Sequence, residues 1–182
     1  MSLRRALFLD RDGVINIDHG YVHRVDQVDF VDGIFALCRA AQRHGYLSVV
    51  ITNQAGIGRG YYDEGDFRAL MSWMKTEFER AGASLDGVYH CPHHPVHGLG
   101  VYRIACACRK PEPGLLLAAQ QELSLDLSTS VLIGDKMSDI EAGRRAGVGQ
   151  RILLSGDAAA LDGAGEAVLP SLDLIRFHLF GH

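Results

Sequence analysis

The feature that most constrains the fold is an apolar run, residues 6–9, that ends directly in two aspartates, Asp10 and Asp12. If the run is a buried strand, both aspartates emerge at its carboxyl end, where open α/β sheets bind ligands. Side chains two positions apart on an extended chain point the same way, so the two carboxylates would share one site. Such crowding is costly unless a cation or a proton separates the charges. Magnesium with a phosphate ester is a natural occupant, because magnesium combines carboxylate oxygens with substrate phosphates.

A turn is the alternative interpretation, since Asp and Gly are common turn formers and the pattern also resembles part of a calcium-binding loop. The rest of the chain favours the strand. Further apolar strand candidates are found at residues 47–51, 131–133 and 151–154, and helical patterns lie at 34–44, 64–81, 113–123 and 138–146. Alternating strands and helices predict an α/β fold in three layers, a parallel sheet with helices on both faces.

Size and charge narrow the class of protein. The 182 residues, 47% of them hydrophobic, are enough for one full core, and we expect a single domain over residues 1–182. The net charge is −4 and the basic residues are scattered, unlike the footprint of a nucleic-acid binder. No apolar run is long enough for a membrane span and no leader is evident, so we expect a cytoplasmic protein. We also expect it to be a monomer. The stretch 156–165 is interpreted as a surface loop or weak helix.

Polar side chains also follow the second apolar run. Thr52, Asn53 and Gln54 come directly after it, followed by a glycine-rich stretch, residues 56–60. A threonine hydroxyl, backbone N–H groups and a flexible loop can all donate to phosphate oxygens. An ordinary loop between a strand and a helix remains an equal alternative for this segment alone.

Charged residues also lie beside the ends of two further predicted segments. Arg109 and Lys110 precede the helix at 113–123, where positive charge could stabilise a transferring phosphoryl group. Asp135 follows the apolar run at 131–133, and Asp139 opens the next helix, where it could instead serve as an anion at the helix N-terminus.

The ordered set of DxD, Thr, Lys and GDxxxD, each near the end of an apolar strand, closely resembles the haloacid dehalogenase superfamily of phosphohydrolases. The motifs run from Asp10 to Asp139, most of the chain. The resemblance implies a Rossmann-like sheet, an aspartyl-phosphate intermediate and one magnesium ion. The predicted fold is therefore α/β, with helices on both faces of the sheet.

Roles for individual residues follow from the same resemblance. Asp10 is expected to be the nucleophile and Asp12 the general acid and base. Thr52 and Lys110 would hold the transferring phosphoryl group. Asp135 would complete the magnesium site with Asp10 and the backbone carbonyl of Asp12. The residue types suit this chemistry, since a carboxylate nucleophile divides one difficult displacement into two easier ones.

A second cluster of metal-ligating residues lies in a loop over residues 91–108. Three thiols and one imidazole in paired spacing are typical of a closed tetrahedral zinc site. Spacing alone leaves His93, His94 and His97 open as the imidazole donor, and the family resemblance favours His93. The predicted zinc ligands are Cys91, His93, Cys106 and Cys108. Because four protein ligands leave no open position, the zinc is expected to be structural; a redox role is the less favoured alternative.

The zinc loop also narrows the substrate. Its position resembles two groups of small phosphatases, one acting on a heptose bisphosphate and the other on histidinol phosphate. Residues 18–23 and 56–61 favour the first group, without indicating which anomer is preferred. The interval from Gly13 to Ile34 allows a small flap and no large cap domain. The predicted substrate-binding residues are Asp18, His19, Gly20, Tyr21, Asn53, Gln54, Arg109 and Lys136.

Two functions of other kinds are the alternatives. One is a non-catalytic, zinc-stabilised binding module whose aspartates merely hold a divalent ion. Such a module would be expected to lack the nucleophile or the general acid, and this chain has both. The other is a nucleic-acid 3′-phosphatase with a similar Thr-Asn-Gln motif. The acidic charge balance and the zinc loop argue against it. A magnesium-dependent phosphatase of a small sugar bisphosphate is the favoured interpretation.

Overall fold

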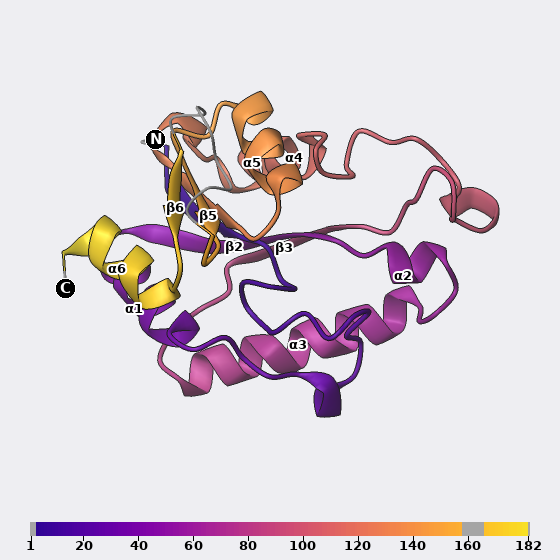
Figure 1. Cartoon of the computed structure of the whole chain (residues 1–182), viewed down its shortest axis with the longest axis horizontal. Helices are drawn as coiled ribbons and strands as arrows, with labels where there is room; N and C mark the ends of the chain where they lie inside the picture. The colour runs from indigo at the N-terminus through magenta and orange to yellow at the C-terminus, as the bar shows by residue number, and fades with distance from the viewer. Residues whose placement is uncertain (1–2, 158–165, 182) are drawn as a thin grey trace.

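The computed structural model describes residues 3–157 and 166–181, which form a central parallel sheet flanked by helices (Figure 1). The six strands of this sheet lie in the order β3-β2-β1-β4-β5-β6. They are β1 (Arg5–Leu9), β2 (Tyr46–Asn53), β3 (Gly87–Cys91), β4 (Val131–Gly134), β5 (Gln150–Leu154) and β6 (Ala167–Leu169). The strand order reverses at β1. Open α/β sheets bind ligands at the carboxyl ends of strands beside such a reversal.

Alternate side chains of each strand face different layers of helices. In β1, Leu7 and Leu9 belong to one apolar cluster, while Ala6 and Phe8 belong to the other. Figure 1 shows α1, α3 and α6 on one face of the sheet and α4 and α5 on the other. These helices are α1 (Ile34–Arg43), α3 (Glu64–Arg80), α4 (Gly114–Leu123), α5 (Met137–Ala146) and α6 (Leu172–Phe180). The predicted three-layer α/β fold is confirmed.

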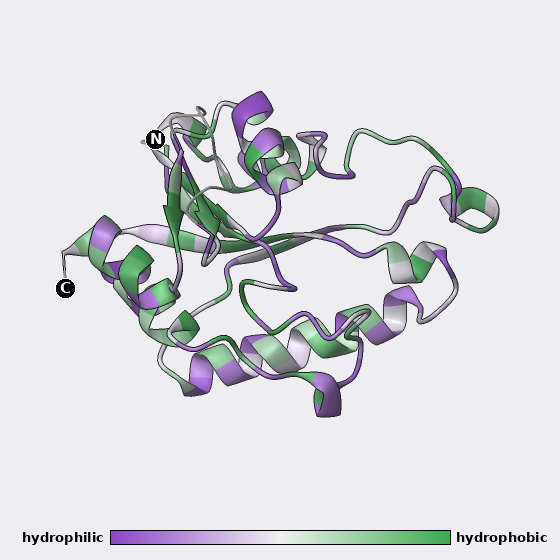
Figure 2. Ribbon diagram, in the orientation of Figure 1, coloured by the Kyte–Doolittle hydropathy of each residue, from purple (hydrophilic) through white to green (hydrophobic). Residues whose placement is uncertain are grey.

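Burial on both faces explains why the central strands could be recognised in the sequence. A strand covered on both sides is apolar along its whole length instead of alternating. Figure 2 shows this as green strands between helices that carry hydrophilic residues on their outer sides. Each predicted strand and helix is found within one or two residues of its expected bounds.

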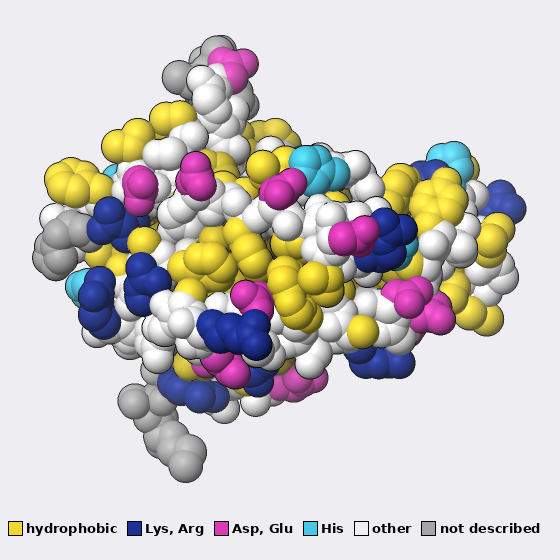
Figure 3. Space-filling view, turned by 90° about the horizontal axis from the view of Figure 1, so that it is seen from below, with side chains coloured by type: hydrophobic (Ala, Val, Ile, Leu, Met, Phe, Trp, Pro, Cys, Tyr) yellow, Lys and Arg dark blue, Asp and Glu magenta, His cyan; other side chains and the backbone are white. Residues whose placement is uncertain are grey.

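The connection between β1 and α1 is the small flap that was predicted. Its only helical turn is the 3₁₀ helix η1 (Val25–Gln27), and no cap domain is inserted between β1 and α1. The remaining short elements are α2 (Ala55–Gly58), η2 (Gly100–Tyr102) and η3 (Leu127–Thr129). The face in Figure 3 carries both basic and acidic side chains across its width. Among the described residues, no helix is both long and apolar enough to cross a membrane.

Besides α2 and the three 3₁₀ helices, the elements β3, β6 and α6 were not predicted. The two strands form the edges of the sheet, and their residues are mostly half-buried or exposed. Strand β3 lacks a continuous apolar run, whereas β6 is a short apolar run of three residues that the prediction missed. Helix α6 is preceded by its N-cap residue Ser171, whose hydroxyl accepts a hydrogen bond from the backbone N–H of Leu174. A serine at the N-cap position is a known signal for the start of a helix, but the prediction relied on apolar periodicity alone. Most of the predicted loop or weak helix at 156–165 lies outside the described residues.

Candidate active site

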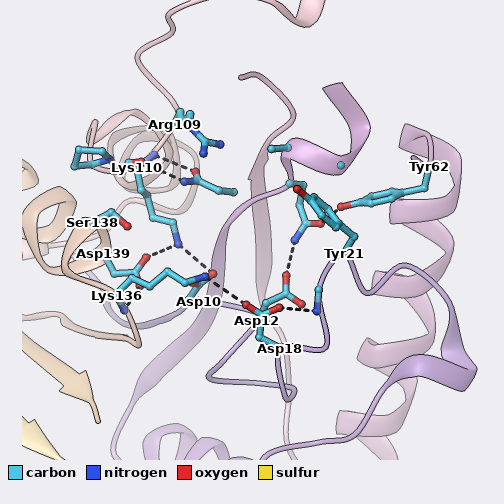
Figure 4. Close-up of a pocket in the computed structure, with 16 residues that line it drawn as sticks. Asp10, Asp12, Asp18, Tyr21, Tyr62, Arg109, Lys110, Lys136, Ser138 and Asp139 are labelled. Atoms are coloured by element: carbon cyan, nitrogen blue, oxygen red, sulfur yellow. Dashed lines mark hydrogen bonds and ion pairs between the residues drawn. The ribbon is translucent and has the colours of Figure 1, made fainter. Parts of the chain in front are cut away.

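A cavity of about 590 Å³ opens at the carboxyl ends of β1 and β2 and at the start of α5 (Figure 4). It is wide enough for a small organic phosphate, and its walls are dominated by charged and polar side chains. The lining residues are Asp10, Asp12, Asp18, Gly20, Tyr21, Asn53, Gln54, Ala55, Gly56, Tyr62, Arg109, Lys110, Pro111, Lys136, Ser138 and Asp139. Most of the predicted site residues are therefore brought to one place from distant parts of the sequence.

Lys110 is the central cation of the cavity. Its Nζ lies 3.1 Å from Asp10 Oδ1 and 2.6 Å from Asp139 Oδ1, and it donates to the carbonyl of Ile51 at 3.0 Å. The Asn53 side chain fixes the backbone of Lys110, accepting from its N–H at 3.0 Å and donating to its carbonyl at 3.2 Å. Asn53 at the end of β2 thus holds the lysine beside the aspartate at the end of β1.

The carboxylates around Lys110 form a strongly charged cluster. Oxygens of Asp10, Asp135 and Asp139 all lie within 4.8 Å of one another. Burial, opposed by Lys110 and reinforced by the other two carboxylates, raises the pKa of Asp10 to about 7. Burial opposes the charge of Lys110, but its ion pairs with Asp10 and Asp139 outweigh this and raise the pKa of the lysine. Lys136 adds a second positive charge near Asp135 and Asp10, and two cations still do not balance three carboxylates.

The cluster fits a divalent metal ion. Besides the excess of negative charge, Oδ1 of Asp135 is buried and accepts no hydrogen bond from any described residue. Carboxylate oxygens of this kind are the ligands that magnesium prefers. The third carboxylate of the side-chain cluster is Asp139 and not Asp12. A contribution from the backbone carbonyl of Asp12 stays a prediction.

Gly13 lets the first strand-end loop approach Asp135. Its φ is +90°, a conformation that L side chains rarely adopt. A Cβ at this position would lie 2.2 Å from Asp135 Oδ2, so any side chain would displace the carboxylate. The glycine after the two aspartates is therefore needed for the geometry of the site and not only for a turn.

Asp12 lies beside the cluster with its carboxylate held by hydrogen bonds. Arg11, Asn16 and Gln54 donate to it. Thr52 is fully buried, and its hydroxyl accepts from Gln54 Nε2 at 2.7 Å. The predicted catalytic residues Asp10, Asp12, Thr52 and Lys110 thus come from three separate segments and meet at one edge of the sheet.

The flap supplies one side of the cavity mouth. Asp18, Gly20 and Tyr21 line the cavity, and Asp18 Oδ2 lies 3.4 Å from Nζ of Lys136 at the start of α5. His19 is placed differently: it is not among the lining residues, and its Nε2 lies 2.7 Å from Asp29 Oδ2. The geometry therefore gives His19 a contact within the flap.

The predicted zinc ligands come together outside the cavity. The ligand atoms of the four residues lie within 4.8 Å of one another; they are those of Cys91, His93, Cys106 and Cys108. His94 points elsewhere, because its Nδ1 accepts from the backbone N–H groups of Val96 and His97. His93 is thus the imidazole placed with the thiols. Three thiols and one imidazole fit a closed zinc site. Cys38 is buried in α1, apart from this cluster.

The thiol cluster adjoins the cationic wall of the cavity. Arg109 and Lys110 follow Cys108 directly in the chain, and Arg109 Nη1 donates to the carbonyl of His93 at 3.4 Å. The loop between β3 and α4 contains only η2 as regular structure, so its shape depends on contacts of this kind.

Three contributions to the site were not predicted. Arg11 is fully buried and contacts Asp12, and Tyr62 contacts Gln54. Asp139 was expected as a possible helix N-terminal anion, and its Oδ2 does accept from the N–H of Lys136 at 3.1 Å. It also forms the ion pair with Lys110, which could not be inferred from its position in the helix.

The glycine-rich stretch has a packing function. Residues 55–58 form the short helix α2, and a Cβ on Gly56 would lie 2.2 Å from the Tyr62 ring. Glycine here allows the tyrosine to approach the site closely. This close packing could not be read from the sequence, where phosphate binding and an ordinary loop were equal alternatives.

Comparisons with known proteins agree with this geometry. The family model described as HAD-hydrolase-like matches residues 107–173. A D-glycero-alpha-D-manno-heptose-1,7-bisphosphate 7-phosphatase from Burkholderia mallei is 57% identical over 95% of this chain and 93% of its own. A D-glycero-beta-D-manno-heptose-1,7-bisphosphate 7-phosphatase from Vibrio cholerae is 50% identical over 82% of this chain and 80% of its own. The crystal structure of a D,D-heptose 1,7-bisphosphate phosphatase from B. bronchiseptica, complexed with magnesium and phosphate, matches with a TM-score of 0.84 and 28% identity, covering 97% of this chain and 98% of the other.

Proposed function

This chain belongs to the haloacid dehalogenase-like hydrolase family, and from that premise we propose that it is a magnesium-dependent phosphatase that removes the 7-phosphate of D-glycero-D-manno-heptose 1,7-bisphosphate. The observation that carries the proposal is the placement of Lys110 between two carboxylates at the base of a polar cavity. A phosphate monoester needs a nucleophile, a cation and a proton donor within reach of one another. The cavity offers all three.

The reaction proceeds in two displacements. In the first, a carboxylate oxygen of Asp10 attacks phosphorus, the bond between phosphorus and the sugar oxygen breaks, and Asp12 gives its proton to the leaving oxygen. In the second, water attacks phosphorus, Asp12 takes the proton from that water, and Asp10 is released with inorganic phosphate. Lys110 and Thr52 would hold the phosphoryl oxygens during both steps.

Both metals have a place in this proposal. Asp10, Asp135 and the backbone carbonyl of Asp12 would hold magnesium, which offsets the repulsion between an anionic nucleophile and an anionic phosphate. Zinc held by the cluster of three cysteines and His93 would keep the loop over 91–108 rigid and so place Arg109 and Lys110 at the cavity. We infer a single phosphohydrolase domain over residues 1–182. We still predict, without a test so far, that the protein is a cytoplasmic monomer and has no nucleic-acid or membrane partner.

Selection of the substrate would depend on the cavity rim. Asp18, Gly20, Tyr21 and Lys136 surround the mouth, and Arg109 lies on the opposite wall from the flap (Figure 4). These groups suit the hydroxyls and the second, anomeric phosphate of an extended sugar bisphosphate. No contact in the cavity specifically favours histidinol phosphate, and the presence of both Asp10 and Asp12 argues against a binding module without catalysis.

A substrate panel tests the proposal. Phosphate release should be measured with the alpha and beta anomers of heptose 1,7-bisphosphate, histidinol phosphate and a 3′-phosphorylated oligonucleotide. We expect the highest kcat/KM for one of the two heptose bisphosphates. A higher kcat/KM for histidinol phosphate would replace the proposed substrate, whereas hydrolysis of none of these esters would remove the proposed activity.

Replacing Arg109 should separate substrate recognition from chemistry. Arg109→Ala should lower kcat/KM for heptose 1,7-bisphosphate by roughly ten- to a hundredfold, because a lost charge-assisted contact is worth about 1.5–3 kcal/mol. A small monophosphate that cannot reach the arginine should lose far less. Lys110→Ala should reduce both, since the lysine serves the phosphoryl group that the substrates share.

Arg103→Ala is the matched control, because Arg103 is an exposed arginine on the same loop and does not line the cavity. It should leave both substrates unaffected. If Arg109→Ala lowers kcat/KM equally for the two substrates, Arg109 serves catalysis or the structure of the site and does not recognise the substrate.

A further inference from the structure

Three side chains converge on the carboxylate of Asp12. Arg11 Nη2 lies 2.8 Å from Oδ1 and 2.9 Å from Oδ2, Asn16 Nδ2 donates to Oδ1 at 3.1 Å, and Gln54 Nε2 donates to Oδ2 at 3.2 Å. Only 17% of the Asp12 side chain is exposed. Both oxygens are therefore restrained, and the carboxylate can present itself to the cavity in few orientations.

Gln54 can assist Asp12 only in one orientation of its amide. Its Nε2 donates both to Asp12 and to Thr52 Oγ1, while its Oε1 accepts from the Tyr62 hydroxyl at 2.5 Å. A reversed amide would turn its oxygen toward the Asp12 carboxylate, where two acceptors would repel each other. The same reversal would turn the amide nitrogen toward the Tyr62 hydroxyl.

The Tyr62 hydroxyl is suited to keep the amide in the assisting orientation. Tyr62 is 7% exposed and Gln54 is 2% exposed, so water does not readily replace either partner. Burial raises the pKa of Tyr62 to about 12, which keeps the phenol protonated and able to donate at neutral pH. The close approach of Gly56 to the ring holds the tyrosine in place.

We propose that Tyr62 and Gln54 are positioning residues for the acid–base group: Tyr62 orients the Gln54 amide, and Gln54, together with Arg11, aims the Asp12 carboxylate at the oxygen of the leaving group. This inference rests on the proposed phosphatase activity and does not depend on which phosphate ester is the natural substrate. Gln54, which was predicted to bind substrate, is thereby assigned to the support of Asp12. Tyr62 also lines the cavity, and it acts on Asp12 through Gln54.

Arg11 supports the same carboxylate from the protein interior. It is fully buried, and Nη2 also donates to the carbonyl of Val22 in the flap at 2.6 Å. Its Nε and Nη1 have no hydrogen-bond partner among the described residues. Burying a guanidinium with two unpaired nitrogens is unfavourable, which fits a residue retained for its contacts with Asp12 and the flap.

The proposal makes a distinction between leaving groups. A sugar alkoxide must be protonated as the bond to phosphorus breaks, so its departure depends on the aim of Asp12. A nitrophenolate is stable as an anion near neutral pH and leaves without that proton. Since kcat/KM reports the steps up to departure of the leaving group, a displaced Asp12 should penalise the sugar ester selectively.

Tyr62→Phe tests the inference, because it removes the hydroxyl and keeps the packed ring. We expect kcat/KM for heptose 1,7-bisphosphate to fall roughly tenfold or more relative to the change for p-nitrophenyl phosphate, with the midpoint of thermal unfolding nearly unchanged. Gln54→Leu, a second variant of similar volume, should show the same selectivity with a larger loss, because it removes all three hydrogen bonds of the amide, including the one to Asp12. Any effect through Thr52 is common to the two esters and cancels in their ratio.

Tyr89→Phe is the matched control, since Tyr89 does not line the cavity and its hydroxyl donates to Glu122 at 2.9 Å. Loss of this hydroxyl should leave kcat/KM unchanged for both esters. Equal losses on the two esters in Tyr62→Phe and Gln54→Leu, or no loss in either variant, would overturn the positioning role while leaving the proposed phosphatase intact. A wild-type protein that hydrolyses neither ester would instead remove the proposed function, and the inference with it.

Discussion

Asp10→Asn should abolish phosphate release while the protein still folds and binds its substrate. The amide is nearly isosteric with the carboxylate but cannot act as the nucleophile, so we expect kcat to fall by roughly 10⁴-fold or more. The fold should persist, because Lys110 keeps its ion pair with Asp139 at 2.6 Å and its bond to the Ile51 carbonyl at 3.0 Å. Phosphate release, substrate binding by calorimetry and thermal unfolding should be measured on the same preparation.

The matched control for this change is Asp173→Asn, which alters the same chemical group on the outer surface of α6. The Asp173 side chain is 65% exposed, with only a 3.5 Å contact to Arg176, and its replacement should leave turnover unaffected. In addition, mass spectrometry of acid-quenched wild-type enzyme should detect a phosphorylated peptide containing Asp10. Phosphate release by Asp10→Asn at the wild-type rate would contradict the covalent mechanism.

Cys106→Ser and Cys108→Ser should each lower the zinc content to well below one ion per chain. Because binding of a structural zinc ion is coupled to folding of its site, the loop over 91–108 should lose its fixed shape and the protein should unfold at a lower temperature. Activity should also fall, since Arg109 and Lys110 follow Cys108 directly and Arg109 contacts the carbonyl of His93. Elemental analysis, thermal unfolding and phosphate release measure these three effects.

Cys38→Ala separates loss of a thiol from loss of a metal ligand. Cys38 is a buried cysteine of α1 outside the four-residue cluster, so its replacement should leave the zinc content unchanged even if packing suffers. Full zinc content in both Cys106→Ser and Cys108→Ser would show that the ligands were wrongly assigned.

The parts of the fold that could be predicted are those in which several consecutive residues are all buried. The central strands β1, β2 and β4 are buried on both faces over most of their length, so their sequences are mainly apolar, and their ends could be located to within two residues. Polar residues at those ends, such as Asp10, Thr52 and Asp135, could then be assigned to one edge of the sheet. The edge strand β3 is only partly buried and leaves no such pattern, whereas β6 has an apolar run of three residues that the prediction missed.

Contacts within the site were harder to anticipate, because they depend on the path of the backbone between the strands. Nothing in the local sequence around Tyr62 indicates that its hydroxyl meets Gln54, eight residues earlier. The single charged residue between Asp10 and Asp12 could have been a solvated side chain, yet Arg11 is fully buried. The ion pair between Lys110 and Asp139 likewise appears only when α5 is placed beside the end of β1.

The position of β3 has a consequence for how such an enzyme can diversify. Within the described sheet β3 pairs with β2 alone, so the chain that continues from Cys91 leaves the sheet at an open edge. Insertions there need no compensating change in a neighbouring strand, whereas Asp10, Asn53 and Asp135 follow strands that each have neighbours on both sides. Substrate choice can therefore change with the length of this loop, provided that Lys110 at its end keeps its contacts with Asn53 and the Ile51 carbonyl.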